Sequence, residues 1–383
     1  MPPDLNAVIA QYEGSPKLVV AAIHGTALGG GLEVAFGCHY RCAVAGGQVG
    51  FPEVKLGLLP GAGGPQRLPR LTGPEAALPL IVAGDPIPAA KAQALGIIDE
   101  IVPGALLEGA CAYAERLVAE GKPLRKIRDL GEKVRGTSPA VFAEFRKGLE
   151  RSARGFFAPF RCVDAVEAAA TLPFDEGLKR ERELFAQCMQ STQSKAQIHV
   201  FSSEREVTKI PDVPKETPVK TIASAAVIGA GTMGGGIAMN FANAGIPVRV
   251  LEMSQEALEK GVAVVRKNYA ATVEKGRLSQ KDMDARMALI QGTLAYDAVA
   301  EADIVVEAVF EEMDVKKKVF AVLDKAAKPG AILACNTSTL DIDQMANATS
   351  RPGQVIGTHF FSPANVMRLL EIVRGKATSK DTI

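Results

Sequence analysis

The chain has 383 residues, which is enough for two or three domains with separate hydrophobic cores. Apolar residues make up 47% and charged residues 23%, the proportions of a globular protein. The net charge is +1, so the charge balance gives no indication of a nucleic-acid or anionic-membrane partner. The apolar runs are short and interrupted by charge or glycine, so no membrane span is predicted. The motif Cys38-His39-x-x-Cys42 lacks a second ligand pair at zinc spacing, so no metal site is predicted.

The first predicted strand covers residues 17–24, KLVVAAIH, a β-branched apolar run. Three consecutive glycines, Gly29, Gly30 and Gly31, follow it and precede a helical pattern over residues 32–43, LEVAFGCHYRCA. Glycines at the start of a helix bring bare backbone N–H groups close to a ligand at the positive end of the helix dipole. This arrangement suits an anion or a developing oxyanion.

Two glutamates flank this glycine turn along the sequence. Glu33 lies in the predicted first turn of the helix, and Glu53 lies 20 residues later in a predicted loop, VGFPEVKLGLLPG. Two carboxylates around an apolar pocket can divide acid and base work if their pKa values differ. The spacing alone favours the simpler interpretation, in which Glu33 is a helix N-terminal acid stabilised by the dipole and Glu53 is a surface acid of the loop.

The middle of the chain is predicted to be helical. An amphipathic helix is expected over residues 104–120, a charged helical region over 124–160, and a long helix over 163–190 with a solvated face at Lys179 to Glu183. Residues 207–220 contain three prolines and predict an extended linker, where we place a domain boundary.

Residues 225–252, AAVIGAGTMGGGIAMNFANAGIPVRVLE, combine a strand, a glycine turn, a helix and a second strand. Gly229, Gly231 and Gly234 have G-x-G-x-x-G spacing, which suits a tight turn, a close approach to a pyrophosphate, and packing of the helix on the strand. Glu252 ends the second strand, where its carboxylate can bind adenosine ribose hydroxyls and repel the 2′-phosphate of NADP. The sequence therefore predicts an NAD site.

Three polar blocks follow strand-like runs in the last third, where doubly wound sheets bind ligands. A histidine at a strand end is compatible with a satisfied core residue. This histidine is followed by a Phe-Phe-Ser-Pro turn and, twelve residues after the histidine, by a glutamate. A histidine–glutamate pair can take the proton of an alcohol while a hydride is transferred to nicotinamide. The blocks are Glu311 with Lys316, Asn336-Thr337-Ser338, and His359 with Glu371.

The segments HGTALGGGLEVAFGCHYRCA, VGFPEVKLGLLPGAGGPQRLPRLTG and GDPIPAAKAQALGIIDEIV resemble the enoyl-CoA hydratase/isomerase (crotonase) family over residues 17–102. The resemblance implies that the Gly30 N–H is one of two oxyanion donors to a thioester oxygen. It implies that Glu33 and Glu53 orient water and exchange a proton with the α-carbon, and that Glu53 also serves double-bond isomerisation. The family's second oxyanion donor lies further upstream, so a truncated and impaired hydratase region is expected.

The segments VIGAGTMGGGIA, VVEAVFEEMDVKKKVF, NTSTL and THFFSPANVMRLLEIVRG resemble the NAD-binding domain of L-3-hydroxyacyl-CoA dehydrogenases over residues 218–383. The resemblance implies that His359 is the base with Glu371 as its partner, and that Ser338 bonds the substrate oxygen. It places Glu311 and Lys316 near the cofactor. In that family a helical domain follows, so a second truncation is expected after the last residue.

The order of these regions resembles the bifunctional enzymes of fatty-acid β-oxidation. The resemblance implies an α/β protein with a partial crotonase-like β/β/α fold at residues 1–120, a helical segment and linker at 121–217, and a doubly wound Rossmann domain at 218–383.

The expected function is hydration and isomerisation of 2-enoyl-CoA, followed by NAD-dependent oxidation of L-3-hydroxyacyl-CoA to 3-ketoacyl-CoA. Acyl-CoA thioesters are the expected partners, and the oligomeric state is not predicted. The alternative is a non-catalytic NAD- or CoA-binding fragment. The expected location is the cytoplasm for a bacterial protein and the peroxisome for a eukaryotic one.

Overall fold

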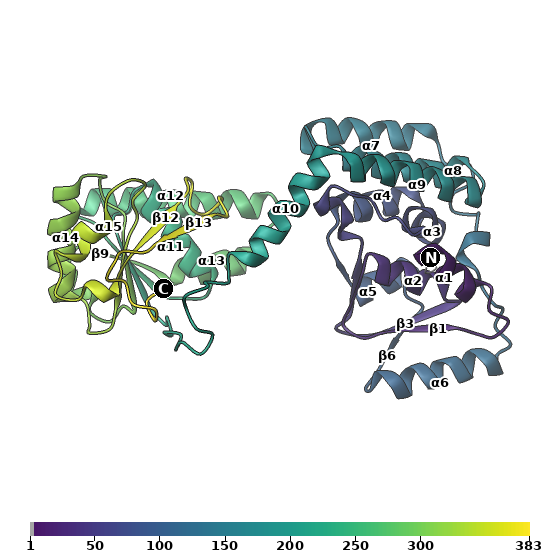
Figure 1. The fold of residues 1–383 in the computed structure, drawn as a ribbon, viewed down its shortest axis with the longest axis horizontal. Helices are drawn as coiled ribbons and strands as arrows, with labels where there is room; N and C mark the ends of the chain where they lie inside the picture. Colours follow the sequence, from purple (N-terminus) through teal and green to yellow (C-terminus); the bar gives the residue numbers. More distant parts are fainter. Residues whose placement is uncertain (1–3) are drawn as a thin grey trace. The chain divides into compact units, whose positions relative to one another are not determined.

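The computed structural model describes residues 4–383, and the chain divides between Lys209 and Ile210 into two compact units (Figure 1). The three-part division into residues 1–120, 121–217 and 218–383 stays a prediction. Among residues 4–383, no helix is both long and apolar enough to cross a membrane, and no group of three or more His, Cys, Asp or Glu side chains is arranged to hold a metal ion.

The first unit contains two small sheets. Strands β1 (Val20–Ile23), β3 (Tyr40–Val44) and β6 (Glu100–Val102) form a parallel sheet in the order β1-β3-β6. Strands β2 (Thr26–Leu28), β4 (Gln48–Gly50) and β5 (Ile87–Pro88) form a second sheet in the order β2-β4-β5, in which β5 is antiparallel.

The helix predicted over residues 32–43 is wrong in its second half. Helix α2 (Gly30–Gly37) stops at Gly37, and the following residues form the central strand β3. Residues 40–43 are buried between β1 and β6. A short apolar run that is buried on both sides has no helical or strand periodicity of its own, so the sequence pattern could not distinguish the two.

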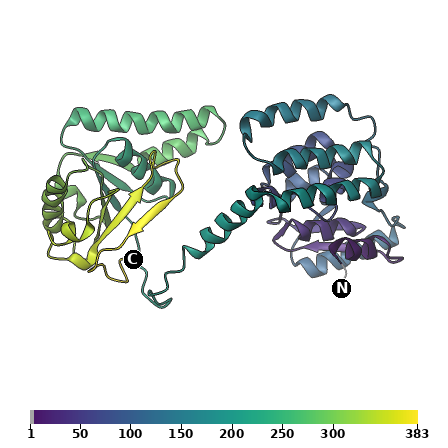
Figure 2. The same ribbon diagram turned by 45° about the horizontal axis from the view of Figure 1, so that its top comes forward.

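Helices cover these sheets. Helices α7, α8 and α9 lie side by side over α3 and α4 (Figures 1 and 2). The helices of this unit are α1 (Leu5–Glu13), η1 (Pro52–Leu56), α3 (Gly64–Thr72), α4 (Pro74–Ala83), α5 (Ala89–Ala94), α6 (Leu106–Ala119), η2 (Ile127–Asp129), α7 (Pro139–Ser152), α8 (Ala158–Thr171), α9 (Phe174–Gln190) and α10 (Thr192–Glu206).

The single long helix predicted over residues 163–190 is two helices, α8 and α9. Pro173 separates them, because proline has no N–H to donate and its ring clashes with the preceding turn. The predicted solvated face at Lys179 to Glu183 is also wrong at its centre, where Glu181 is fully buried. Glu181 belongs to the buried stripe of α9, which consists of Phe174, Gly177, Glu181, Leu184 and Cys188.

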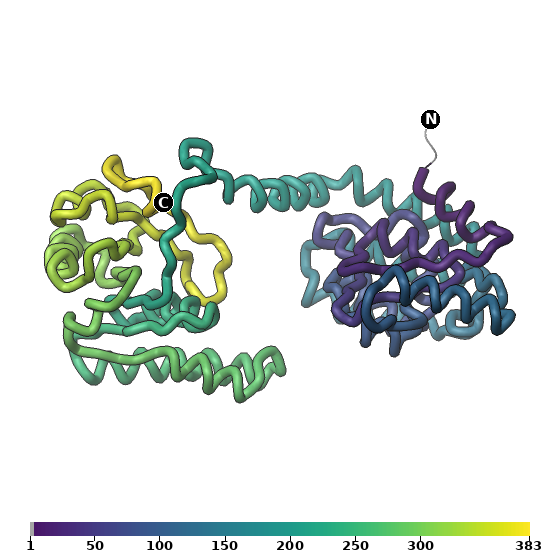
Figure 3. The backbone as a smooth tube through the Cα atoms, turned by 90° about the horizontal axis from the view of Figure 1, so that it is seen from below, coloured from purple at the N-terminus to yellow at the C-terminus, as the bar shows by residue number. Residues whose placement is uncertain are grey.

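The segment between α10 and the next strand has no regular helix or strand, as Figure 3 shows. Strand β7 (Ala225–Ile228) then begins the second unit's sheet of seven strands, in the order β13-β12-β11-β10-β7-β8-β9. All strands are parallel except β13. The others are β8 (Val248–Leu251), β9 (Ile290–Thr293), β10 (Ile304–Glu307), β11 (Ile332–Cys335), β12 (Val355–Phe360) and β13 (Leu370–Val373). Strands β9 and β13 were not predicted.

Both faces of this sheet are covered by helices. Ala225 and Val227 face a core formed with α11 (Thr232–Asn243), α12 (Gln255–Glu274) and α13 (Gln280–Ala288). Ala226 and Ile228 face a second core formed with η3 (Tyr296–Val299), α14 (Met313–Ala326) and α15 (Ile342–Ala346). A short turn, η4 (Pro352–Gln354), precedes β12. The doubly wound α/β fold predicted for this region is confirmed, and its strand order reverses between β7 and β10, where such sheets bind ligands.

Candidate active sites

The three glycines after β7 have different surroundings. Gly229 has φ +103°, and a Cβ atom there would lie 2.8 Å from the Ala308 carbonyl oxygen. A Cβ atom on Gly234 would collide with the Gly229 carbonyl oxygen, because α11 packs directly on the turn. A Cβ atom on Gly231 would meet no protein atom within 4 Å. The space above Gly231 is therefore open to a ligand.

This open side belongs to a cavity of about 690 Å³ at the carboxyl ends of β7, β8 and β10. Helix α11 starts there without a side-chain cap, so its first N–H groups point to the cavity without intrahelical acceptors. Glu252 lies at the rim, where its carboxylate accepts hydrogen bonds from the N–H groups of Ala230 (2.9 Å) and Met253 (2.8 Å). Met253 and Phe310 add exposed apolar walls. Donors for a pyrophosphate, a carboxylate for ribose hydroxyls and apolar walls for a flat ring fit a dinucleotide.

The different surroundings of Gly231 and Gly234 predict different effects of adding a methyl group. We expect Gly231→Ala to keep the thermal stability and to lower NAD affinity at least about tenfold, because the methyl group occupies the space of the pyrophosphate. We expect Gly234→Ala to lower both, because its methyl group meets backbone rather than ligand. Calorimetric NAD titration and thermal unfolding of both variants check this. Unchanged NAD affinity in Gly231→Ala would contradict the assignment of the cavity.

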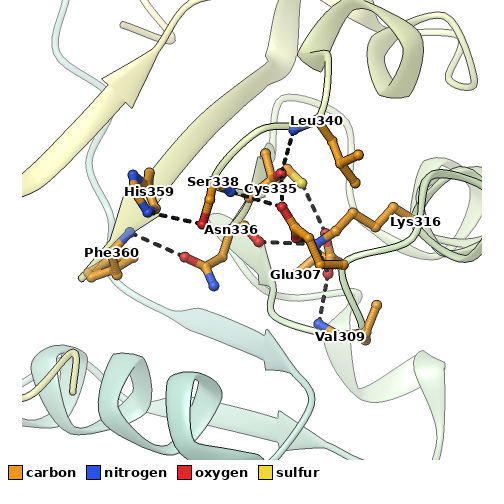
Figure 4. Close-up of polar contacts among 11 residues, drawn as sticks. Glu307, Val309, Lys316, Cys335, Asn336, Ser338, Leu340, His359 and Phe360 are labelled. Atoms are coloured by element: carbon orange, nitrogen blue, oxygen red, sulfur yellow. Dashed lines mark hydrogen bonds and ion pairs between the residues drawn. The ribbon is translucent and has the colours of Figure 1, made fainter. Parts of the chain in front are cut away.

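His359 and Glu371 form a hydrogen-bonded pair, with 2.7 Å between His359 Nδ1 and Glu371 Oε2. The two residues are direct cross-strand partners in the antiparallel pairing of β12 and β13. A carboxylate only accepts, so it fixes the proton on Nδ1 and leaves Nε2 as an acceptor. Nε2 lies 3.2 Å from Ser338 Oγ (Figure 4). The imidazole therefore presents an unprotonated nitrogen beside a hydroxyl group.

Ser338 is held in turn by Glu311, whose Oε1 accepts from the Ser338 N–H (2.9 Å) and from the Thr337 hydroxyl. Burial disfavours the Glu311 carboxylate, but these hydrogen bonds and the neighbouring Lys316 outweigh that effect and lower the pKa of Glu311. Lys316 Nζ lies 3.2 Å from Glu311 Oε2. The Lys316 side chain, which the resemblance places near the cofactor, is fully buried beside Glu311.

The partner of Lys316 in the interior is Glu307, which the sequence reasoning did not single out. Lys316 Nζ lies 2.9 and 3.0 Å from the two Glu307 carboxylate oxygens and 3.0 Å from the Asn336 carbonyl oxygen (Figure 4). Both charged side chains have no exposed area. The signal in the sequence was an acidic residue at the end of an otherwise apolar strand, IVVE.

Removing one partner of this buried ion pair should destabilise the second unit. We expect Lys316→Met to lower the free energy of unfolding by about 3–5 kcal/mol, because it leaves the Glu307 carboxylate buried without a counter-charge. Urea denaturation checks the loss, with Lys318→Met as the matched control on the exposed side of α14, expected to change stability by less than about 0.5 kcal/mol. Combining Lys316→Met with Glu307→Gln should restore part of the stability. A loss below about 1 kcal/mol in the single variant would contradict the interpretation.

In the first unit, the glycine turn joins β2 to α2. Gly29 has φ +52°, and a Cβ atom there would collide with the Glu53 carboxyl group, so the turn and the carboxyl are in contact. Gly30 is the first residue of α2, and this helix has no side-chain cap at Gly29. The N–H of Gly30 is therefore at a helix start, as the oxyanion prediction requires.

Glu33 lies in the first turn of α2 and is 3% exposed. Its Oε1 accepts hydrogen bonds from the N–H groups of Ala62 (2.7 Å) and Gly64 (2.8 Å). Glu33 therefore lies in the first turn of the helix, as predicted, and its carboxyl is buried. The surface interpretation concerned Glu53, whose side chain is half-buried. Glu53 lies in the short helix η1 rather than in a loop, and its Oε2 is buried without a hydrogen-bond partner among residues 4–383. The Glu53 carboxyl contacts the Gly29 turn and the Glu33 carboxyl binds the Ala62–Gly64 turn, and the two are close enough for Glu33 to affect the pKa of Glu53.

Burial changes the acidity of both groups. Desolvation raises the pKa of Glu33, against the two backbone hydrogen bonds that favour its carboxylate. Desolvation, with a smaller effect from Glu33, raises the pKa of Glu53 to about 7. A carboxyl group that titrates near neutral pH can exchange a proton with a substrate.

The two candidate sites lie in regions that match two different protein families. Residues 4–142 match the family "Enoyl-CoA hydratase/isomerase", and residues 224–383 match "3-hydroxyacyl-CoA dehydrogenase, NAD binding domain". The peroxisomal bifunctional enzymes of Cavia porcellus and Homo sapiens are each 42% identical to this chain, over 386 and 388 residues. The peroxisomal fatty acid beta-oxidation multifunctional protein MFP2 of Arabidopsis thaliana is 38% identical over 388 residues. Each alignment covers 99% of this chain and 53% of the relative.

The chain contains an enoyl-CoA hydratase/isomerase region followed by the NAD-binding region of a 3-hydroxyacyl-CoA dehydrogenase, and over 99% of its length it is similar to multifunctional fatty-acid β-oxidation enzymes. The resemblance stated from the sequence is thereby confirmed, as are a crotonase-like region followed by a Rossmann-type region and NAD as the cofactor of the second unit. The chain spans about half the length of the curated relatives it matches. The roles of the individual site residues stay predictions.

Proposed function

We propose that this chain hydrates 2-enoyl-CoA thioesters in its first unit and oxidises L-3-hydroxyacyl-CoA to 3-ketoacyl-CoA with NAD in its second. The main observation that supports the proposal is the position of His359, whose two ring nitrogens form hydrogen bonds with the Glu371 carboxylate and the Ser338 hydroxyl group. We also assign double-bond isomerisation to the first unit, with Glu53 as the group that moves the proton.

For oxidation, His359 Nε2 is the base that removes the proton of the substrate hydroxyl. Ser338 Oγ–H donates a hydrogen bond to the same oxygen, and Glu371 stabilises the imidazolium that forms. The Gly231 turn would hold the pyrophosphate of NAD and Glu252 its adenosine ribose, and the nicotinamide would supply the acceptor for the hydride from carbon 3. Glu311 keeps Ser338 in place through the hydrogen bond from the Ser338 N–H, and Lys316 forms an ion pair with Glu311.

For hydration, Glu33 orients a water molecule and removes its proton as the oxygen bonds to carbon 3. Glu53 delivers a proton to the α-carbon, for which it has to be protonated near neutral pH. The Gly30 N–H donates to the thioester oxygen, on which negative charge develops. For isomerisation, Glu53 removes a proton from the α-carbon and returns it to the γ-carbon as the double bond moves between positions 3 and 2.

Two assays on one sample, with NAD affinity as a control, test the proposal. NADH formation from L-3-hydroxybutyryl-CoA follows the second unit, and hydration of crotonyl-CoA follows the first. Turnover in both assays supports the proposal. NAD binding without turnover in either assay would instead support a non-catalytic NAD- or CoA-binding role. Absence of NAD binding would contradict the assignment of the Gly229–Gly234 turn.

We further propose a peroxisomal location if the source is eukaryotic and a cytoplasmic location if it is bacterial. The similar animal and plant proteins are named as peroxisomal or glyoxysomal. Fractionation of source cells with an antibody to this chain, against a peroxisomal marker, tests the eukaryotic case. Recovery of the protein only with cytosolic markers would contradict it.

A further inference from the structure

Three successive backbone N–H groups in the turn before α3 are divided between two glutamates. Ala62 and Gly64 donate to Glu33, as described above, and the N–H of Gly63 between them donates to Glu181 Oε1 over 2.7 Å. Glu33 comes from α2 and Glu181 comes from α9, which is 148 residues further along the chain. The turn therefore links the proposed hydration site to helix α9. This helix lies outside the residues that match the enoyl-CoA hydratase/isomerase family, which end at residue 142.

Helix α9 contacts this turn at more than one point. A Cβ atom on Gly61 would lie 2.8 Å from the Phe185 ring, and one on Gly63 would lie 3.1 Å from the Leu178 side chain. Gly63 itself has φ +93°, a conformation that glycine adopts without strain. Glycine permits more backbone conformations than other residues do, so the observed conformation of this turn depends on its contacts. These contacts come from α9 on one side and from Glu33 on the other.

No ion pair among residues 4–383 accounts for the buried position of Glu181. The neighbouring guanidinium of Arg67 is engaged by Glu13, with Nε–Oε1 and Nη2–Oε2 distances of 2.9 and 2.8 Å, and by the Ala62 carbonyl oxygen. Glu181 Oε2 is buried without a hydrogen-bond partner among residues 4–383, and so is the side-chain oxygen of Gln66. Burial, with the nearby Glu33 carboxyl, raises the pKa of Glu181 well above its usual range. A neutral Glu181 keeps its acceptor for Gly63 and adds no second charge beside Glu33.

We propose that Glu181 is a positioning residue for Glu33, holding the Ala62–Gly64 turn so that both of the turn's outer N–H groups point at one Glu33 oxygen. The functional part of this proposal rests on the proposed hydratase activity of the first unit. With Oε1 fixed by two hydrogen bonds, the other Glu33 oxygen keeps a single orientation toward water and substrate. Loss of the Gly63 hydrogen bond frees the turn and makes the Glu33 carboxyl less well placed.

Two substitutions at one position separate positioning from packing. Glu181→Gln keeps an oxygen acceptor for Gly63 and is neutral, so it should behave like the unchanged chain. Glu181→Met keeps a similar volume and removes the acceptor. Leu184→Ala is the matched control, because Leu184 is also fully buried on α9 but makes no hydrogen bond to the turn. The dehydrogenase activity of the second unit serves as an internal control in all three variants.

The deciding measurement does not depend on turnover. Carbon-detected NMR of a labelled Glu33 side chain gives its titration, and amide hydrogen exchange gives the protection of Ala62, Gly63 and Gly64. We expect Glu181→Met to shift the Glu33 titration upward, because the carboxylate loses well-aligned donors, and to speed exchange at all three amides. An unchanged titration and unchanged exchange would overturn the proposal, as would the same changes in Leu184→Ala.

Kinetics then test the consequence for catalysis. We expect kcat for crotonyl-CoA hydration to fall about tenfold or more in Glu181→Met with KM changed less than about threefold, and Glu181→Gln to recover at least half of the original rate. An altered Glu33 titration with unaltered kcat would overturn the catalytic part of the proposal. If the unchanged chain does not hydrate crotonyl-CoA, the proposed function fails, while the titration and exchange data still decide whether Glu181 positions Glu33.

Discussion

Replacing His359 with glutamine is expected to lower kcat for NAD-dependent oxidation of L-3-hydroxybutyryl-CoA by about 10²- to 10⁴-fold. Glutamine has a similar size and can still donate and accept hydrogen bonds, but it cannot take the proton of the substrate hydroxyl. NAD affinity should stay within about twofold, because His359 does not line the cavity at the glycine turn. Initial rates of NADH formation, together with calorimetric NAD titration, check both expectations.

His199→Gln is the matched control for this experiment, because His199 is exposed on α10 in the other unit. It should leave the oxidation rate unchanged. Glu371→Gln should have a smaller effect than His359→Gln, because it removes the group that fixes the tautomer but keeps the base. A rate for His359→Gln within threefold of the unchanged chain would rule out His359 as the base.

The second large effect is expected at Glu53. Glu53→Gln should lower crotonyl-CoA hydration by about 10²- to 10⁴-fold, because an amide cannot deliver a proton to the α-carbon. The unchanged chain should lose hydration rate above pH 7, since the raised pKa of Glu53, about 7, leaves the carboxyl ionised there. A hydration rate that rises between pH 7 and 9 would contradict this role and indicate that Glu53 acts as a base.

The same residue predicts a change in stability that does not depend on activity. Because burial raises the pKa of Glu53 from 4.5 to about 7, the folded chain binds this proton more tightly than the unfolded chain does. Stability therefore falls as pH rises from about 4.5 to 7, by at most about 3 kcal/mol. Glu53→Gln removes this loss, so the variant should be more stable than the unchanged chain at pH 8 and not at pH 4.5. Urea denaturation at the two pH values checks the difference.

The glycine turn and the strands beside it could be predicted from sequence because their causes are local. Gly229 and Gly231 lie in the turn before α11, and Gly234 lies in the first turn of this helix, where it packs on the Gly229 carbonyl group. The apolar runs that form β7, β8, β10, β11 and β12 are short and bounded by polar residues, as buried parallel strands are. The polar groups at their carboxyl ends follow from the topology of such sheets.

The features that were missed depend on contacts between distant segments. Strand β13, LEIV, is only four residues long and is exposed throughout although three of its residues are apolar, and it forms because β12 offers it an edge. Residues 40–44 form a strand because β1 and β6 lie on either side of them. Glu181 looked solvated in a charged segment, yet it occupies a buried position of a regular three-and-four spacing with Phe174, Gly177, Leu184 and Cys188. That spacing was visible in the sequence, and an acid within it was the signal of a buried carboxyl.

The cross-strand pairing of His359 with Glu371 affects how related chains can be compared. Side chains alternate between the two faces of a strand, so inserting or deleting one residue on β13 would turn Glu371 away from the histidine. A change of length in the nine-residue connection between β12 and β13 has no such effect if the pairing is kept, because the strands and not the connection set which residues meet. Homologues should therefore tolerate indels between Phe360 and Leu370, and a search pattern that requires a fixed twelve-residue interval from histidine to glutamate would miss family members that retain the pair.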